Sequence, residues 1–326
     1  MYDYTILVLH GAYGSGVGAT LDILHTAATL APTVKWPAPS WRVVSPDGGS
    51  VALGRGLHVD TAALPRRVRD DASTWVVPGM GVDDPAEIAR RLAHDDAQRA
   101  IAALQRHVAR GGAVAASCSS VFVLQAAGLL RGRRVTTSWW LAPALRRLEP
   151  DCVVDADRMV CADGPLTTAG AAFAQSDLML HLLRARFGIA LADVVSRVLL
   201  IDGRAAQAPF VIPAMLANGD ELVRRLTQRI EKALPDLPGI AALAEAFAMS
   251  PRTLARRVHA ATGCSALALV QSVRLNRARA LIETSRLTID EVAARVGYAD
   301  ATALRRLMRK QTGVTPGRFR PGVYAG

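Results

Sequence analysis

A cysteine at the end of a short apolar segment is the residue best placed for covalent chemistry. Residues 111–127 read GGAVAASCSSVFVLQAA, in which AVAAS predicts a buried strand that leads directly into Cys118 and then a helix. Such an elbow presents its side chain at the carboxyl end of the strand, against the amides that begin the helix. Those amides would lower the pKa of a thiol or bind an anion. The pattern allows either a cysteine nucleophile or an anion-binding crevice.

A second set of chemically capable residues lies near the other end of the chain. Arg252 and Arg256 stand four residues apart in SPRTLARRV, and Arg305 and Arg306 lie in ADATALRRL. In both segments the apolar residues recur at helical spacing on a different face from the arginines. An arginine-bearing face beside a short turn is what a reader of the DNA major groove needs.

Two helix-turn-helix units are predicted to position these arginines. The first is marked by Leu243, Phe247, Ser250, Leu254, Val258 and Gly263, and the second by Val292, Val296, Gly297, Asp300, Leu304 and Met308. Leu254 corresponds to Leu304 and Gly263 to Gly313, at an offset of 50 in both cases (304 − 254 and 313 − 263), which indicates duplication. A single unit would equally fit a helical hairpin with a solvated basic face. Two capped, arginine-bearing copies favour DNA binding.

The distribution of charge agrees with this interpretation. The chain has a net charge of +11. Residues 1–210 contain 21 Lys and Arg against 19 Asp and Glu, giving +2, whereas residues 211–326 contain 18 against 9, giving +9. The basic excess therefore belongs to the C-terminal part, as attraction to phosphates requires.

Residues 240–320 resemble the DNA-binding module of AraC/XylS-type transcription regulators. The resemblance is carried by SPRTLARRV followed by ATG, by RLNRARALIETSRLTIDEVAARVGY and by TGVTPGRFR. It implies seven helices, a long one within residues 266–284 that joins the two units, and recognition helices in successive major grooves. The residues expected at the DNA are Arg252, Ala255, Arg256, Thr302, Arg305, Arg306, Arg309 and Lys310. The resemblance also implies double-stranded promoter DNA and RNA polymerase as partners, and favours activation of transcription.

The N-terminal part alternates short apolar strands with helices. TILVLH, WRVVS, WVVPG and AVAAS predict strands, and helices are expected at about residues 19–30 and 85–108. This alternation predicts an α/β fold with a mostly parallel sheet covered on both faces. The glycine-rich GSGVG after the first strand does not keep the GxGxxG spacing, so a dinucleotide site is not predicted.

Residues 4–200 resemble the ThiJ/PfpI family, in particular the version fused to AraC-type modules. WVVPG, the elbow at Cys118, AAGLLRGRRVTTSWW and TTAGAAFAQSDLMLHLLRARFG occur in the family's order. The resemblance implies a class I glutamine amidotransferase-like fold, that is, a flavodoxin-like doubly wound sheet. Catalytic members pair the thiol with an acid from the first strand-to-helix turn and often with a histidine. Here those positions hold Gly16 and Ser138, and Ser120 adds a hydroxyl where substrate room is expected.

The domain is therefore expected to bind a small metabolite without turnover, and with neither cofactor nor metal. The expected ligand pocket consists of Gly79, Met80, Gly81, Cys118, Ser119, Ser120, Ser138 and Trp139. The resemblance implies an amino acid or a quaternary amine as a possible effector, since some relatives of this fused type respond to them, and the face of Trp139 could hold a cation. Packing in the core is the alternative for this ring. Two other functions stay open: a ligand-free dimerisation domain, and a cysteine-dependent hydrolase or glyoxalase-like enzyme tethered to DNA.

These features together predict a two-domain protein. A sensor and dimerisation domain at 1–204, a linker at 205–219 and an all-α DNA-binding domain with two helix-turn-helix units at 220–326 are expected, in a cytoplasmic homodimer that does not enter a membrane. The four cysteines show no metal-binding spacing. Cys152 and Cys161 flank a predicted hairpin and could pair under oxidation, and His181 is expected in the core.

Overall fold

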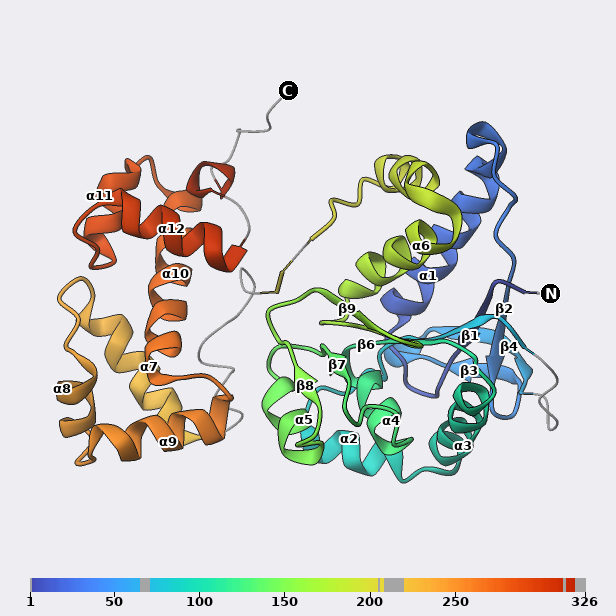
Figure 1. The fold of residues 1–326 in the computed structure, drawn as a ribbon, viewed down its shortest axis with the longest axis horizontal. Helices are drawn as coiled ribbons and strands as arrows, with labels where there is room; N and C mark the ends of the chain where they lie inside the picture. The colour runs from blue at the N-terminus through green and yellow to red at the C-terminus, as the bar shows by residue number, and fades with distance from the viewer. Residues whose placement is uncertain (1, 65–70, 205, 208–219, 313–314, 320–326) are drawn as a thin grey trace. The chain divides into compact units, whose positions relative to one another are not determined.

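The computed structural model describes residues 2–64, 71–204, 206–207, 220–312 and 315–319. By its internal contacts the chain divides into two units, Met1–Arg204 and Ala205–Gly326 (Figure 1). Most of the predicted linker at 205–219 lies outside the described residues. None of the helices described in either unit is long and apolar enough to cross a membrane.

The first unit is built on an eight-stranded sheet in the order β3-β4-β2-β1-β5-β6-β10-β9. The strands are β1 (Tyr4–Leu7), β2 (Trp41–Ser45), β3 (Gly49–Ala52), β4 (His58–Ala63), β5 (Thr74–Val77), β6 (Val114–Ser117), β9 (Val160–Asp163) and β10 (Leu166–Ala169). The pairings from β4 to β10 are parallel, and only the outermost strands β3 and β9 run antiparallel to their neighbours. A separate parallel pair joins β7 (Arg134–Val135) to β8 (Val153–Val154).

Helices cover both faces of this sheet (Figure 1). They are α1 (Gly14–Leu30), α2 (Pro85–Leu92), α3 (Asp95–Ala109), α4 (Val121–Ala126), α5 (Ala142–Leu148) and α6 (Ala174–Val198). On one face Ile6 and Val76 pack with α1 and α6, and on the other Leu7 and Val77 pack with α2, α3 and α4. Since successive residues of a strand point to opposite faces, continuous apolar runs are what a doubly covered sheet requires. The predicted doubly wound, mostly parallel fold is confirmed.

Three details of the first unit differ from the sequence-based expectation. The helix expected at 85–108 is two helices, because the chain leaves the helical conformation at His94 before α3 begins. The hairpin expected between Cys152 and Cys161 is wrong: β8 pairs with β7, and β9 pairs with β10. The β3–β4 hairpin was not predicted. All four cysteines are free thiols.

From residue 220 onward, the described residues of the second unit form helices and the turns that connect them. Its helices are α7 (Glu221–Ala233), α8 (Ile240–Glu245), α9 (Pro251–Thr262), α10 (Ala266–Thr284), α11 (Ile289–Arg295), α12 (Ala301–Thr312) and the short 3₁₀ helix η6 (Pro316–Phe319). The pairs α8–α9 and α11–α12 are the two predicted helix-turn-helix units, and α10 is the predicted long helix between them (Figure 1). Leu281, Val292 and Leu304 belong to the hydrophobic core that joins the second helix-turn-helix pair, α11–α12, to α10.

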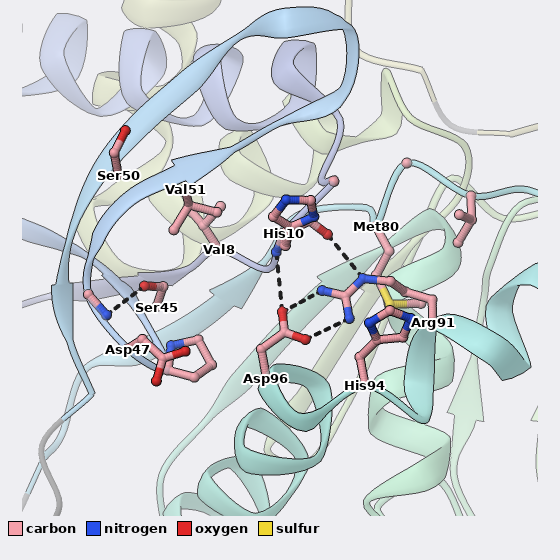
Figure 2. Close-up of a pocket in the computed structure, with 15 residues that line it drawn as sticks. Val8, His10, Ser45, Asp47, Ser50, Val51, Met80, Arg91, His94 and Asp96 are labelled. Atoms are coloured by element: carbon pink, nitrogen blue, oxygen red, sulfur yellow. Dashed lines mark hydrogen bonds and ion pairs between the residues drawn. The ribbon is translucent and has the colours of Figure 1, made fainter.

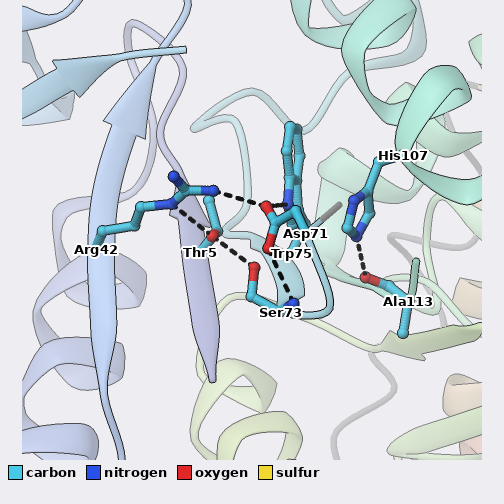
Figure 3. A network of polar contacts seen from close by, with 7 residues as sticks. All are labelled: Thr5, Arg42, Asp71, Ser73, Trp75, His107 and Ala113. Carbon is cyan, nitrogen blue, oxygen red and sulfur yellow. Dashed lines mark hydrogen bonds and ion pairs between the residues drawn. The ribbon is translucent and has the colours of Figure 1, made fainter. Parts of the chain in front are cut away.

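A largely buried network of polar side chains lies at the amino end of β5 (Figure 3). Asp71 accepts hydrogen bonds from the indole of Trp75 (2.9 Å) and from the guanidinium of Arg42 (2.6 Å). The ring of His107 stacks on Trp75 at 4.6 Å between centroids, and its Nε2 lies 3.2 Å from the carbonyl oxygen of Ala113. Only 1% of His107 is exposed. Burial lowers the pKa of His107, because the charged imidazolium loses its hydration there.

This burial predicts a pH dependence of stability. The unfolded chain should bind a proton on His107 near the ordinary pKa of 6.5, whereas the folded chain binds it only at lower pH. The free energy of unfolding should therefore fall as pH drops below that value, by at most about 1.4 kcal/mol per pH unit. Urea unfolding between pH 8 and pH 5, followed by tryptophan fluorescence, measures it, because all five tryptophans lie in the first unit. The slope should shrink in His107→Gln and persist in His25→Gln, an exposed control; equal slopes in both would contradict the assignment.

Candidate DNA-binding surface and ligand site

The first candidate recognition helix, α9, is fixed by its caps and by its buried stripe. Ser250 caps its start by accepting a hydrogen bond from the N–H of Thr253 (3.1 Å), and Gly263 ends it in the left-handed conformation. Leu254 and Val258 are fully buried. As predicted from the spacing, Arg252, Ala255 and Arg256 are exposed.

The second candidate recognition helix, α12, is built in the same way. Oδ1 of Asp300 accepts hydrogen bonds from the N–H groups of Thr302 (2.7 Å) and Ala303 (3.0 Å), which hold the pKa of this carboxyl below its usual value. Leu304 and Met308 are fully buried. The exposed residues of this helix include Thr302, Arg305, Arg306 and Arg309. The backbone of Lys310 belongs to α12, but its side chain lies outside the described residues.

The exposed arginines of both helices are available to an external anion. Within the described part of the chain, no carboxylate lies within 4.0 Å of the guanidinium of Arg252, Arg256, Arg305, Arg306 or Arg309. An arginine without an internal partner keeps its forked donors for phosphates and for the O6 and N7 atoms of guanine. Their assignment as DNA contacts remains a prediction.

Arg274, on the long helix α10, binds the turn between α11 and α12. Its Nε donates to the carbonyl of Val296 (2.7 Å), its Nη2 donates to the carbonyl of Gly297, and its guanidinium lies 3.7 Å from the ring centroid of Tyr298. Gly297 has a φ of 81°, and a Cβ there would lie 2.4 Å from the carbonyl oxygen of Pro235. Arg274 thus satisfies carbonyls at the end of α11 that the helix itself leaves free. Sequence reasoning did not single it out.

In the first unit, Cys118 occupies the predicted elbow. Its φ is +55°, and its N–H donates to the carbonyl of Gly170 (2.7 Å). The thiol is completely buried, and the hydroxyl of Ser138 donates to Sγ (3.1 Å). Burial raises the pKa of Cys118 above its ordinary value, so the reactive thiolate is disfavoured. This is the opposite of what a cysteine nucleophile needs.

The expected catalytic partners of Cys118 are replaced by packing. Gly16 lies beside Pro78 and Gln175, and the amide of Gln175 bridges the hydroxyls of Ser117 (2.6 Å) and Thr20 (2.8 Å). Within the described residues no carboxylate or imidazole is hydrogen-bonded to the thiol. The hydroxyls of Ser119 and Ser120 instead hold the 78–81 loop, by accepting from the N–H of Met80 (3.1 Å) and donating to the carbonyl of Pro78 (2.6 Å).

A pocket of the first unit lies where the chain leaves the carboxyl ends of β1, β2 and β5 (Figure 2). We call it the β1–β5 pocket. It has a volume of about 700 Å³ and is lined from within residues 8–11, 45–51, 80–82 and 91–96. Of the predicted pocket residues it contains Met80 and Gly81, whereas Gly79, Cys118, Ser119, Ser120, Ser138 and Trp139 do not line it.

The predicted residues outside the β1–β5 pocket are tightly packed. A Cβ on Gly79 would lie 3.1 Å from the Cβ of Cys118 and 3.2 Å from the ring of Tyr13, so no ligand-sized space separates them. Trp139 is 5% exposed and packs edge-on against Trp140, with 5.1 Å between centroids. No group of three or more His, Cys, Asp or Glu suited to a metal occurs in the described parts of either unit.

Sequence reasoning missed the polar groups of this pocket. His10 is the last residue of the first predicted strand, TILVLH, and that position was the available signal. Arg91, His94 and Asp96 reach the pocket because the helical conformation is interrupted between α2 and α3. The continuous helical pattern of the sequence concealed this interruption.

Comparisons with known proteins agree with both halves of this description. Residues 38–185 match the DJ-1/PfpI family, and residues 243–322 match a helix-turn-helix domain family. The HTH-type transcriptional regulator GlxA of Rhizobium meliloti (strain 1021) is 29% identical over 288 residues, which are 86% of this chain and 86% of GlxA. The arabinose operon regulatory protein of Escherichia coli (strain K12) is 33% identical over 104 residues, 32% of this chain and 36% of that protein.

A solved structure confirms the fold of the first unit. DJ-1beta of Drosophila melanogaster superposes with a TM-score of 0.50 at 19% identity, covering 62% of this chain and 100% of that chain. The fold, the two helix-turn-helix units and these relatives define a DNA-binding regulator. Residues 243–322 thus form an AraC-type helix-turn-helix domain, and residues 38–185 belong to a DJ-1/PfpI-type domain that precedes it in the chain.

The exposed arginines yield a test of DNA recognition. Arg256→Ala and Arg306→Ala should each weaken binding to the specific site by about 1–3 kcal/mol if they bond base edges. Arg224→Ala is a matched control, because Arg224 is paired with Glu221 on α7 (2.5 Å). Fluorescence anisotropy at several salt concentrations measures the affinity, which should fall steeply with salt as counterions are released. Full site-specific binding by both variants would rule out these recognition helices.

The contacts of Arg274 predict a local loss of stability. Arg274→Lys keeps the charge but cannot donate to two carbonyls in the same forked geometry or stack as a plane on Tyr298. The turn between α11 and α12 should be destabilised by about 1.5–3 kcal/mol, the range for hydrogen bonds to charged groups. Hydrogen exchange should be faster in α11 and α12 and unchanged in α8 and α9. Arg277→Lys, at an exposed position of the same helix, serves as the control; matching exchange in the two variants would refute the role.

Proposed function

We propose that this regulator binds a small metabolite in its first unit, without chemical turnover, and thereby controls the binding of its second unit to promoter DNA. The observation that carries the proposal is the contrast between the two candidate sites. The arginines of α9 and α12 are exposed and have no carboxylate partner within the described residues, whereas Cys118 is sealed in the core. The chain is equipped to bind DNA but not to activate a thiol.

A cysteine-dependent hydrolase or glyoxalase-like enzyme is the second candidate. The φ of +55° at Cys118 favours it, since a strained elbow is how such folds present a nucleophile. The burial of the thiol and the hydroxyl of Ser138 in place of an imidazole weigh against it. We therefore propose that the first unit senses a ligand.

Further elements of the proposal come from the resemblance alone. The regulator is proposed to act in the cytoplasm as a homodimer, to activate transcription by contacting RNA polymerase, and to respond to an amino acid or a quaternary amine. A cation on the face of Trp139 is disfavoured, because this ring is buried. Equal ligand binding by Trp139→Ala would remove that possibility.

The absence of turnover is tested at the thiol. With its raised pKa and full burial, Cys118 should react with iodoacetamide at neutral pH much more slowly than free cysteine. Cys118→Ala should retain ligand binding and ligand-dependent DNA binding. The half-buried Cys264 provides an internal comparison by peptide mass mapping. If Cys118 is alkylated faster than free cysteine and Cys118→Ala loses the ligand response, the enzyme hypothesis would be favoured instead.

A further inference from the structure

We infer that the β1–β5 pocket, and not the cysteine elbow, is the effector site, and that it takes a small organic anion bearing a carboxylate or phosphate group. The inference rests on the proposed sensing function; of the two effector classes named there it retains amino acids, which carry a carboxylate, and excludes quaternary amines that lack one. The pocket's volume of about 700 Å³ suits a metabolite, and it lies among residues of the first unit alone.

The topology of the sheet places a crevice at this position. From β1 the chain passes to β2 and β4 on one side, and then returns to β5 on the other side of β1. The segments that follow β1 and β5 therefore leave toward opposite faces, α1 to one and α2 to the other. In open α/β sheets such a reversal leaves a crevice at the carboxyl ends of the strands. Val8, Gly11, Met80 and Gly81 line the pocket from these two segments.

Arg91 supplies the pocket with hydrogen-bond donors that are held in a fixed position. It donates from Nε to the carbonyl of His10 (3.0 Å) and from Nη1 and Nη2 to the two carboxylate oxygens of Asp96 (2.8 and 2.5 Å), as Figure 2 shows. A guanidinium has five N–H groups. These contacts use three of them, so two donors have no partner within the described residues. The side chain is 11% exposed and lines the pocket.

The other polar groups add donors without adding uncompensated negative charge. The rings of His10 and His94 lie on either side of Arg91 in Figure 2, and the exposed hydroxyl of Ser50 lines the opposite wall. Each carboxylate of the pocket is paired with an arginine, Asp96 with Arg91 and Asp47 with Arg99, which donates two hydrogen bonds of 2.6 Å each. A ligand oxyanion would meet guanidinium, imidazole and hydroxyl groups rather than bare carboxylates.

Apolar side chains complete the pocket. Val8, Val51, Met80 and Val82 line it together with the polar groups. Val8 and Met80 are buried, whereas Val51 and Val82 are partly exposed. An inorganic ion would leave the exposed part of Val51 and Val82 in contact with water, whereas an organic anion with a short carbon chain would cover it. The combination therefore favours an organic acid or an organic phosphate.

The pocket is tested with the full-length chain and defined probes. Glutarate, glutamate and glycerol 3-phosphate are compared with their uncharged analogues glutaramide and glycerol, by thermal unfolding followed with tryptophan fluorescence and by calorimetry. At least one anion should bind, and its uncharged analogue should bind at least about tenfold more weakly. Binding of uncharged compounds alone would overturn the assignment of ligand class.

Two variants and two controls locate the site. Ser50→Asp places a carboxylate in the pocket, and His94→Ala removes a donor; both residues are exposed, so folding should be preserved. Each should weaken binding of the anion by about tenfold or more. Ser15→Asp and His25→Ala, at exposed positions outside the pocket, should not. Anion binding that survives both pocket variants would place the effector elsewhere and leave the sensing function intact, whereas no binding by any probe would overturn both.

Discussion

Burial of β1 on both faces is the constraint on which the first unit depends. Its four residues are fully buried, with helices α1 and α6 on one side and α2, α3 and α4 on the other. A strand buried in this way cannot turn polar groups outward along its length, so its chemistry is confined to its ends. At the amino end of the neighbouring β5 lies the network of Asp71, Trp75 and His107, and beyond the carboxyl end of β1 lies the pocket with His10. The network at the amino end of β5 stabilises the sheet, and the pocket beyond the carboxyl end of β1 has room for a ligand.

The elbow has the backbone conformation of a nucleophile site, and its thiol is enclosed by packed side chains. The left-handed φ of Cys118 requires that its neighbours hold the turn, and hydroxyl groups do this. Thr137 donates to the carbonyl of Cys118 (2.8 Å), and Ser119 and Ser120 fasten the adjacent loop. A buried polar group left unpaired would cost about 1–3 kcal/mol, so these bonds help to keep the elbow in place without an acid or a base. The same loop carries Met80 and Gly81 into the β1–β5 pocket, so the elbow still supports that pocket.

The sequence predicted the helices of the second unit better than the β1–β5 pocket, and the reason is the range of the interactions involved. The ends of α9 and α12 are set by Ser250 and Asp300, which bond residues two or three positions away, and their faces follow from helical spacing. The pocket depends on contacts across much longer separations. Arg91 donates a hydrogen bond to the carbonyl of His10, 81 residues earlier in the chain. No local sequence pattern predicts a contact over this separation. The break at His94 was concealed because helical residues stand on both sides of it.

Arginine shows why composition alone could not assign these roles. The chain has only three lysines among its 39 basic residues, so nearly every basic function falls to the same side chain. What distinguishes the roles is the partner. Arg274 meets backbone carbonyls and an aromatic ring, Arg91 meets a carboxylate and keeps two donors, and Arg256 has no carboxylate partner within the described residues. A guanidinium bound to carbonyls holds a turn in place, one bound to a carboxylate at a pocket wall can also accept a ligand, and one left alone on a recognition helix is available to DNA.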